Sequence, residues 1–455
     1  MSALRYPPWG WSLIGRVASA RAAANDAWAA RFFCGSCVVH TRDMRRMTVG
    51  HDPAVRQAKA SGTPSVRVLA QSETRPKTLR TSLVAMGDGD NDNMGGIAFD
   101  QLVPSPRGPR FVGDLTTGTK VYGFNGGAVQ TSSALAVLRR AVEPLWTVAL
   151  GTRAIDVTAT TKLLVLDGGL TTWRPVEQLA IRDIVLCAEG YYPTTVAWRA
   201  RKARLVGAFL GDGWLRQDPV RSGYSLGLAI GRGDELHTTK YLKLAEEVLP
   251  NRGWGRGWRA DAPGHFGLSC SSRSSWVAAR DLGLGSKARD KQVPADAFGL
   301  NRDDKLALLA GYFDADGSVA GPGSSNHGRG CVAGTSEQLV VGLRELAIAC
   351  ALHVTAVITS RRSTNYGTAS VWRFTIAADS TAELPLWHRA KAANQRVTSR
   401  RSKAVAARHL SGARLGMGIH ARRVRDVVPA APRQVVSVAA DAIGLVAAGV
   451  VVAGR

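Results

Sequence analysis

Two nine-residue stretches that match each other constrain the fold of this chain most strongly. LVGAFLGDG runs from Leu205 to Gly213, and LAGYFDADG runs from Leu309 to Gly317. Each stretch has small residues four positions apart and ends in Asp-Gly, which predicts a helix with a stripe that another backbone can approach closely. Because both copies carry the stripe, we expect the two helices to pack against each other.

Parallel packing of these helices would bring their final carboxylates together. The C-terminal end of a helix carries partial negative charge, and two adjacent carboxylates repel each other. A bound divalent cation is therefore expected there. Oxygen ligands with open water positions suit Mg²⁺, which polarises a phosphodiester and activates water. The pattern therefore predicts a metal-dependent nuclease centre with Asp212, Asp316, Gly211 and Ala315 at the metal.

The paired motifs resemble those of the LAGLIDADG, or DOD-type, homing endonucleases, whose single-chain members carry two copies. Here the aspartates are 316 − 212 = 104 residues apart. The resemblance implies an α+β fold of two pseudo-symmetric αββαββα halves that form a saddle on DNA. The second motif matches closely and the first more loosely. We place Gly211 opposite Asp314 and expect the first centre to be the impaired one if the two differ.

A block ahead of the second motif begins with KQVP at Lys291. It is similar to the Lys-x-x-Pro block of the same family, which implies that Lys291 is a catalytic residue beside the active centre. Its expected role is to lower the pKa of the attacking water or to hold charge that develops on the phosphate. A plain surface lysine is the alternative at this position.

The charge of the chain indicates a polyanionic partner. The net charge is +24, and residues 196–400 contain 28 basic against 18 acidic residues. The overlapping stretch 396–425 contains nine basic residues and no acidic one. We expect salt-dependent binding of double-stranded DNA by a monomer with internal pseudo-twofold symmetry. No apolar run is long enough to span a membrane, so we expect a cytoplasmic protein that associates with the nucleoid through DNA.

A similar pattern of helices and strands follows each motif. The first half predicts strands at 224–230 and 265–270 and helices at 234–249 and 274–282. The second half predicts strands at 330–333, 353–359 and 371–376 and a helix at 336–350. Basic residues on or beside these strands are candidate DNA contacts: Arg221, Arg232, Arg361, Arg362 and Arg373, with Arg361 and Arg362 expected in a loop.

Short β-type runs separated by glycine-rich turns occupy residues 114–188, which predicts a small all-β domain. The segments DLTTGTKVYGFNGG, from residue 114, and TATTKLLVLDGG, from residue 158, resemble two blocks of the Hint (hedgehog/intein) fold. The final segment, from residue 435, resembles its closing strands. This resemblance implies that the endonuclease is inserted in one β-domain. An unrelated β-barrel is the alternative.

The positions that protein splicing needs are degenerate in this alignment. Splicing requires a thiol or hydroxyl at the first residue, an imidazole that assists the acyl shift, and a final asparagine whose amide cyclises. The first position aligns with Asp114. The histidine position aligns with Thr161, after a retained Thr158, and the final His-Asn with Ala453 and Gly454. The resemblance therefore implies a Hint domain that has lost splicing.

These patterns divide the chain into four parts. We expect a poorly structured leader or host remnant at 1–110, the first Hint part at 111–195, the endonuclease at 196–395 with halves at 196–290 and 291–395, and a basic linker with the second Hint part at 396–455. The first part contains Cys34, Cys37 and His40. Two alternatives remain open for them: a zinc site, or cysteines that are simply reduced thiols. The acidic run at 86–96 lacks the distal glutamate of a calcium loop.

The sequence therefore predicts an intein-type homing endonuclease that makes Mg²⁺-dependent double-strand breaks at a long DNA site. Two alternatives remain open. One is a non-catalytic DNA- or RNA-binding regulator or maturase on the same scaffold. The other is an intein that still splices.

Overall fold

The structure is a computed structural model that describes residues 95–454, apart from short segments. These segments are 126, 152, 169, 189–191, 219–222, 232–234, 251–252, 259–264, 286, 365–366, 397–413 and 417–418. Several sequence-based expectations lie outside the described residues: the zinc candidates Cys34, Cys37 and His40, the acidic run as far as 94, and the DNA-contact candidates Arg221 and Arg232.

The middle of the chain contains the same order of elements twice, αββαββα. The first copy comprises α2 (Ala200–Asp212), β10 (Gly213–Asp218), β11 (Gly223–Gly231), α3 (Glu235–Val248), β12 (Gly255–Trp258), β13 (His265–Cys270) and α4 (Arg273–Asp281). The second comprises α5 (Arg302–Ala315), β14 (Ser318–Val319), β15 (Gly330–Gly334), α6 (Glu337–Ala349), β16 (Ile358–Thr364), β17 (Gly367–Ile376) and α7 (Ala378–Thr381). A short helix, α8 (Arg389–Ala393), follows.

Each copy forms an antiparallel four-stranded sheet with the same strand order. The orders are β10-β11-β13-β12 and β14-β15-β17-β16. Alternate strand residues face the helices, as the twofold period of a strand requires. Leu226 and Leu228 do so in the first sheet, and Val332, Phe374 and Ile376 do so in the second, all of them buried in one hydrophobic core. The two halves therefore share a single core.

Local capping explains where the helices of this region begin. The Asn301 side chain accepts a hydrogen bond from the Asp304 N–H, 2.8 Å away, at the start of α5. The Ser336 hydroxyl accepts from the Leu339 N–H at 3.2 Å at the start of α6. Both caps satisfy backbone donors that a first helical turn leaves without partners.

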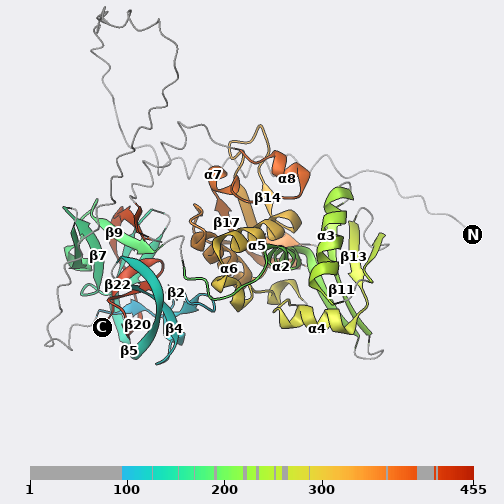
Figure 1. Cartoon of the computed structure of the whole chain (residues 1–455). Coiled ribbons are helices and arrows are strands. Elements are labelled where there is room, and N and C mark those ends of the chain that lie inside the picture. The colour runs from blue at the N-terminus through green and yellow to red at the C-terminus, as the bar shows by residue number, and fades with distance from the viewer. Residues whose placement is uncertain are drawn as a thin grey trace, which may run out of the picture. The chain divides into compact units, whose positions relative to one another are not determined.

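Helices α2 and α5 lie side by side at the centre of this region and contact each other through their backbones (Figure 1). A Cβ atom at Gly207 would come within 1.9 Å of the Leu308 carbonyl oxygen, and one at Gly311 within 2.1 Å of the Arg204 carbonyl oxygen. The two helices run in the same direction, because Gly211 lies beside Ala315 at their common end. The predicted close packing of the two motif helices is confirmed.

The remaining described strands form one twelve-stranded sheet and a two-stranded sheet. Before the α/β region lie β1 (Ile97–Ala98), β2 (Leu102–Val103), β3 (Arg110–Phe111), β4 (Lys120–Asn125), β5 (Ala128–Ala149), β6 (Ala154–Val157), β7 (Lys162–Asp167), β8 (Leu170–Pro175) and β9 (Ile184–Ala188). After it lie β18 (Arg414–Gly416), β19 (Ile419–Arg423), β20 (Asp426–Ala440), β21 (Gly444–Ala447) and β22 (Val450–Ala453).

Strands from before and after the α/β region pair with each other in this β-domain. The long strand β20 runs antiparallel to β5 from Asp426, opposite Ala149, to Ala440, opposite Ala134. In addition, β19 pairs with β9, β21 with β4, and β22 with β7. Since residues on both sides are needed for one sheet, the α/β region is an insertion in the β-domain.

The structure differs from the sequence-based expectation at two boundaries. The β-domain includes residues before 111, because β1 pairs with β20 through Ile97 and Val436. The strand expected at 353–359 has only an isolated bridge at Val354, and the regular strand β16 begins at Ile358. Arg361 and Arg362 therefore lie within a strand and not in a loop. Short strands paired to distant partners leave too weak a local pattern to be found from sequence.

None of the helices described in residues 95–454 combines the length and the apolar character that a membrane span requires.

We expect Gly207→Ala to destabilise the protein by roughly 1–3 kcal/mol or more, because the new methyl group must push α2 away from the Leu308 carbonyl. Gly255→Ala is the matched control, since the nearest atom to its Cβ lies 3.7 Å away. Denaturant unfolding of both variants measures the effect. Equal stability of the two variants would show that the helix contact is not tight.

Candidate active site

The two motif aspartates lie at the common end of α2 and α5. Asp212 is the last residue of α2, and Asp316 follows the end of α5 directly. A Cβ atom at Gly211 would lie 3.2 Å from the Asp316 Cβ, so the two ends are in contact. Asp212 is half-buried and Asp316 is exposed. Both carboxylates are therefore placed where a ligand from solvent can reach them.

The contact between the helices also corrects the register of the two motifs. Gly211 faces Ala315, with 2.8 Å between the Cβ positions, and the separation of 104 residues pairs Leu210 with Asp314. The expectation that Gly211 stands opposite Asp314 was wrong by one position. The asymmetry between the copies lies at Leu210 and Asp314, which are both buried.

Lys291 lies at the aspartates, as the sequence predicted. Its Nζ donates a hydrogen bond to the Gly211 carbonyl oxygen at 2.6 Å, and only 6% of the residue is exposed. Its own carbonyl oxygen accepts from the Ser336 hydroxyl at 2.6 Å, which fixes the backbone. Burial lowers the pKa of Lys291, while Asp212 and Asp316 act in the opposite direction. The ammonium group therefore lies within the field of both carboxylates.

A second lysine, Lys391 in α8, holds the matching position on α5 and was not predicted. Its Nζ donates to the carbonyl oxygens of Phe313, Asp314 and Ala315 at 2.8, 3.0 and 2.9 Å. Burial lowers its pKa, while Asp314, Asp212 and Asp316 raise it. One sequence signal could have found it. Lys291 follows the first motif aspartate by 79 residues, and Lys391 follows the second by 75.

A buried tyrosine contacts one of the carboxylates. The Tyr312 hydroxyl donates to Asp316 Oδ2 at 3.4 Å and lies 3.3 Å from the Ala333 carbonyl oxygen. Burial raises the pKa of Tyr312 well above its usual value, and the charges of Asp316 and Asp212 add to this shift. The phenol therefore stays neutral and orients the Asp316 side chain.

The donor atoms at this site suit Mg²⁺ better than a softer metal. They are the oxygens of Asp212 and Asp316 and the carbonyl oxygens of Gly211 and Ala315, each of which keeps a lone pair beside its bond to lysine. Within the described segments, no group of three or more histidine, cysteine or acidic side chains is arranged to hold a metal. Because Mg²⁺ usually keeps several waters, two carboxylates are a sufficient protein contribution.

Two of the candidate DNA-contact arginines share the face of the second sheet that points away from the helices. Arg373 pairs with Ala333 on β15 and with Ile358 on β16. Arg362 lies four residues after Ile358 on the same strand, so it points to the same face as Arg373. Both arginines also lower the pKa of Cys331, on the same face, against the larger effect of burial, which raises it. Arg361 lies on the opposite face.

The outer face of the first sheet has a basic residue of its own. Arg216 on β10 pairs with Ser225 on β11, in the strand positions that alternate with the buried Leu226 and Leu228. Arg216 is exposed. It is therefore the first-half counterpart of the outward arginines on the second sheet, and the sequence patterns did not single it out.

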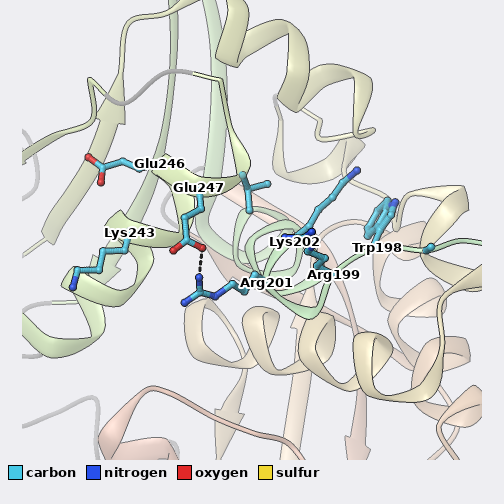
Figure 2. A pocket seen from close by; sticks show the side chains of 9 residues that line it. Trp198, Arg199, Arg201, Lys202, Lys243, Glu246 and Glu247 are labelled. Carbon is cyan, nitrogen blue, oxygen red and sulfur yellow. Dashed lines mark hydrogen bonds and ion pairs between the residues drawn. The ribbon is translucent and has the colours of Figure 1, made fainter.

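A hollow of about 830 Å³ lies at the other end of α2 (Figure 2). It is lined by Ala197, Trp198, Arg199, Arg201, Lys202, Lys243, Glu246, Glu247 and Val248. Arg201 and Glu247 form an exposed ion pair across it. At 1.5 Å per helical residue, the start of α2 is about 18 Å from Asp212. The hollow is therefore separate from the carboxylate site.

The β-domain brings together two of the five expected splicing positions. Thr158 and Thr161 lie 3.0 Å apart through their hydroxyl oxygens. Thr158 Oγ1 accepts from the Gly96 N–H at 2.9 Å, and Thr161 Oγ1 donates to the Gly96 carbonyl oxygen at 3.0 Å. The Gly95 carbonyl oxygen accepts from the Ser437 hydroxyl at 3.0 Å. The peptide group between Gly95 and Gly96 is therefore held by two hydroxyl groups, those of Ser437 and Thr158, and Thr161 holds the carbonyl of the next peptide group.

The structure does not bring Asp114, aligned with the first splicing position, to the threonine pair. Asp114 is exposed in the 3₁₀ turn η3 (Val112–Asp114), whereas the threonine pair contacts Gly96. At the other end of the domain, Ala453 ends β22 opposite Gly444, and the Gly454 N–H donates to the Ile443 carbonyl oxygen at 3.4 Å.

Comparison with known proteins supports the second half of this site. Residues 303–401 match the family model described as a LAGLIDADG-like domain. This range includes Asp316, Lys391 and all of α5 except Arg302. A curated relative, an iron-sulfur cluster assembly SufBD family protein of Mycobacterium leprae, is 24% identical over 309 residues, which is 58% of this chain. The chain spans 33% of that relative's length.

The chain is also similar to two kinds of solved structure. Mesophilic variants of the homing endonuclease I-DmoI match with 13% identity and a TM-score of 0.30, over 41% of this chain and 96% of that one. A DnaB intein from Synechocystis sp. PCC 6803 matches with 19% identity and a TM-score of 0.19, over 21% of this chain and 69% of that one.

We expect Asp316→Asn to lower the pKa of both Lys291 and Lys391 further, because it removes a negative charge that favours each ammonium form. Titration of ¹³C-labelled lysine side chains by NMR measures the shifts. Lys305 is the internal control, since burial lowers its pKa and the neighbouring Cys350 raises it. An unchanged Lys391 in this variant would place it outside the field of the carboxylate.

Proposed function

We propose that this chain is an intein-type homing endonuclease that makes Mg²⁺-dependent double-strand breaks at a long DNA site. The observation that carries the proposal is the junction of α2 and α5, where two carboxylates and two lysines meet. A pure binding protein gains nothing from two carboxylates that face a phosphate backbone. The match of residues 303–401 to a LAGLIDADG-like domain supports the same assignment.

The residues at the junction divide the chemistry between them. Asp212 and Asp316 would hold Mg²⁺, and the ion would supply Lewis-acid activation of the attacking water and of a phosphate oxygen. Lys291 and Lys391 place positive charge beside the phosphate as negative charge develops on it. Lys291 is tied to the end of α2 and Lys391 to the end of α5, so each lysine serves one strand of the DNA.

Recognition of DNA rests on the outer faces of the two sheets. Arg216 on the first sheet and Arg362 and Arg373 on the second point away from the helical core. Antiparallel strands fit the major groove, where side chains can contact phosphates and base edges. We also propose that the protein acts as a monomer on double-stranded DNA and is located in the cytoplasm, at the nucleoid.

A cleavage selection tests this function directly. The protein is incubated with a randomised double-stranded DNA library in Mg²⁺ or in EDTA, and the cut ends are captured and sequenced. The proposal predicts one enriched family of sites that is cut only with Mg²⁺. A library that stays intact under both conditions, while the protein still binds DNA, supports the alternative of a non-catalytic regulator.

On the selected site, we expect Asp212→Asn and Asp316→Asn each to reduce double-strand cutting by more than about 100-fold, because a metal ligand with full charge is lost. Asp281→Asn is the matched control, since Asp281 is exposed on α4 and, among the residues that the structure describes, pairs with the adjacent Arg280 alone. Gel analysis of plasmid cleavage measures the rates. Wild-type cutting by Asp316→Asn would remove that residue from the catalytic set.

We further propose that the β-domain has lost protein splicing. Gly96 has no nucleophilic side chain, Thr161 has no imidazole, and Gly454 has no amide to cyclise. The hydroxyls of Thr158 and Ser437 still bind the Gly95–Gly96 peptide group, which we propose as the place of the N-terminal junction, and the Thr161 hydroxyl binds the Gly96 carbonyl oxygen beside it. Binding of the peptide is thus retained without the groups that react.

The chain expressed between two reporter segments is expected to yield no ligated product. In a Thr161→His background, Gly96→Cys should restore cleavage after Gly95 by dithiothreitol, because the new thiol adjoins the Gly95 carbonyl carbon. Asp114→Cys in the same background is the matched control and should stay intact. Mass spectrometry identifies the fragments. Cleavage at residue 113 in the control would reinstate the original alignment, and ligation by the wild type would overturn the loss of splicing.

A further inference from the structure

The second motif contains a buried carboxylate, Asp314, that the proposed cleavage chemistry does not use. Its side chain is 0% exposed and its carboxylate makes four hydrogen bonds. Oδ2 accepts from Arg204 Nη1 at 2.8 Å and from the Tyr241 hydroxyl at 3.0 Å. Oδ1 accepts from the backbone N–H groups of Trp387 and His388 at 2.8 and 2.9 Å. Asp314 therefore connects α5 to α2, to α3 and to residues 387–388.

Arg204 binds the same segment of chain from the other side. Its Nη2 donates to the Pro385 carbonyl oxygen at 2.5 Å, and its guanidinium carbon lies 4.2 Å from the centre of the Trp387 ring. The Tyr241 and Trp387 rings meet edge to face at 5.4 Å. Residues 385–388, which we call the strap, are thus held on α2 and α3 of the first half.

The strap leads directly into the helix that carries Lys391. The His388 side chain caps α8 by accepting from the Lys391 N–H at 3.4 Å. Three residues after His388, the Lys391 ammonium group reaches the last carbonyl oxygens of α5. Asp314 therefore binds the two backbone N–H groups that directly precede α8. Their position determines where α8 begins and so where Lys391 lies.

The first half has no equivalent of this anchor. Leu210 occupies the place of Asp314, and Leu308 occupies the place of Arg204, since 204 + 104 = 308. Both leucines are buried in the core. Lys291 is held instead by the hydrogen bond from Ser336 to its carbonyl oxygen. The two lysines are therefore held in place by different interactions: the Ser336 hydrogen bond for Lys291, and the bonds from the strap to Asp314 for Lys391.

We propose that Asp314 is a positioning residue that fixes Lys391 through the strap, so that the second centre depends on a buried ion pair and the first does not. The consequence for DNA cutting rests on the proposed endonuclease function. A small displacement of a reacting group reduces its rate by roughly 100-fold. Loss of the anchor therefore slows the cutting of one strand and leaves the other strand unaffected.

The test uses the full chain and two kinds of measurement. The double variant Arg204→Leu, Asp314→Leu places leucines at both positions, as Leu308 and Leu210 do at the related positions. Replacement of a buried ion pair by apolar residues is often neutral for stability. Asp314→Asn is the second variant, and Lys391→Met is the reference for a lost lysine. Lysine acetylation followed by mass spectrometry measures how well each ammonium group is held, independently of DNA.

We expect Lys391 to be acetylated on the order of ten times faster in both Asp314 variants, with Lys291 unchanged as the internal control. On a plasmid with the selected site, we expect both variants and Lys391→Met to accumulate nicked product, with second-strand cutting slowed roughly 100-fold. Slow acetylation of Lys391 and equal cutting of both strands in a folded variant would overturn the proposal. If the wild type cuts no DNA, the endonuclease proposal fails, while the acetylation comparison still decides the role of Asp314.

Discussion

The contact between α2 and α5 is the constraint on which the rest of the molecule depends. Gly207 and Gly311 allow each backbone to touch the other, and the ends of both helices are thereby brought to one place. The shared core forms around this crossing, and the two sheets extend from it. Any side chain at these two glycines separates the helices, and with them the aspartates.

The sequence predicted the parts of the structure that are repeated or strictly periodic. The paired motifs placed Asp212, Asp316 and Lys291 together, and the main helices of both halves were found within a few residues. The strands β10, β12 and β14 were not predicted, and the strand expected at 353–359 has only an isolated bridge before β16. Lys391 was not predicted, because it lies on a five-residue helix with no motif around it. Gly96 was not singled out because the side chains that contact it, Thr158 and Thr161, are more than sixty residues away in the sequence. Long-range contacts of this kind leave no local signal.

The site also changes the electrostatic argument made from the sequence. Two carboxylates at the negative ends of two helices required positive charge, and a divalent cation was the expected source. Lys291 and Lys391 provide part of that charge, since their ammonium groups bind the last carbonyl oxygens of α2 and α5. The protein can therefore fold with both aspartates in place before any metal is bound.

The ion pair between Arg204 and Asp314 also bears on the history of the two halves. Two copies of the second half, joined in the same way, would place Asp314 against Leu308 and bury a carboxylate without a cation. Two copies of the first half would place Arg204 against Leu210 and bury an unpaired guanidinium. Neither half can replace the other in a symmetric dimer. Each half is therefore complementary to the other half and not to a second copy of itself, because the charge that one half buries is neutralised by a residue of the other.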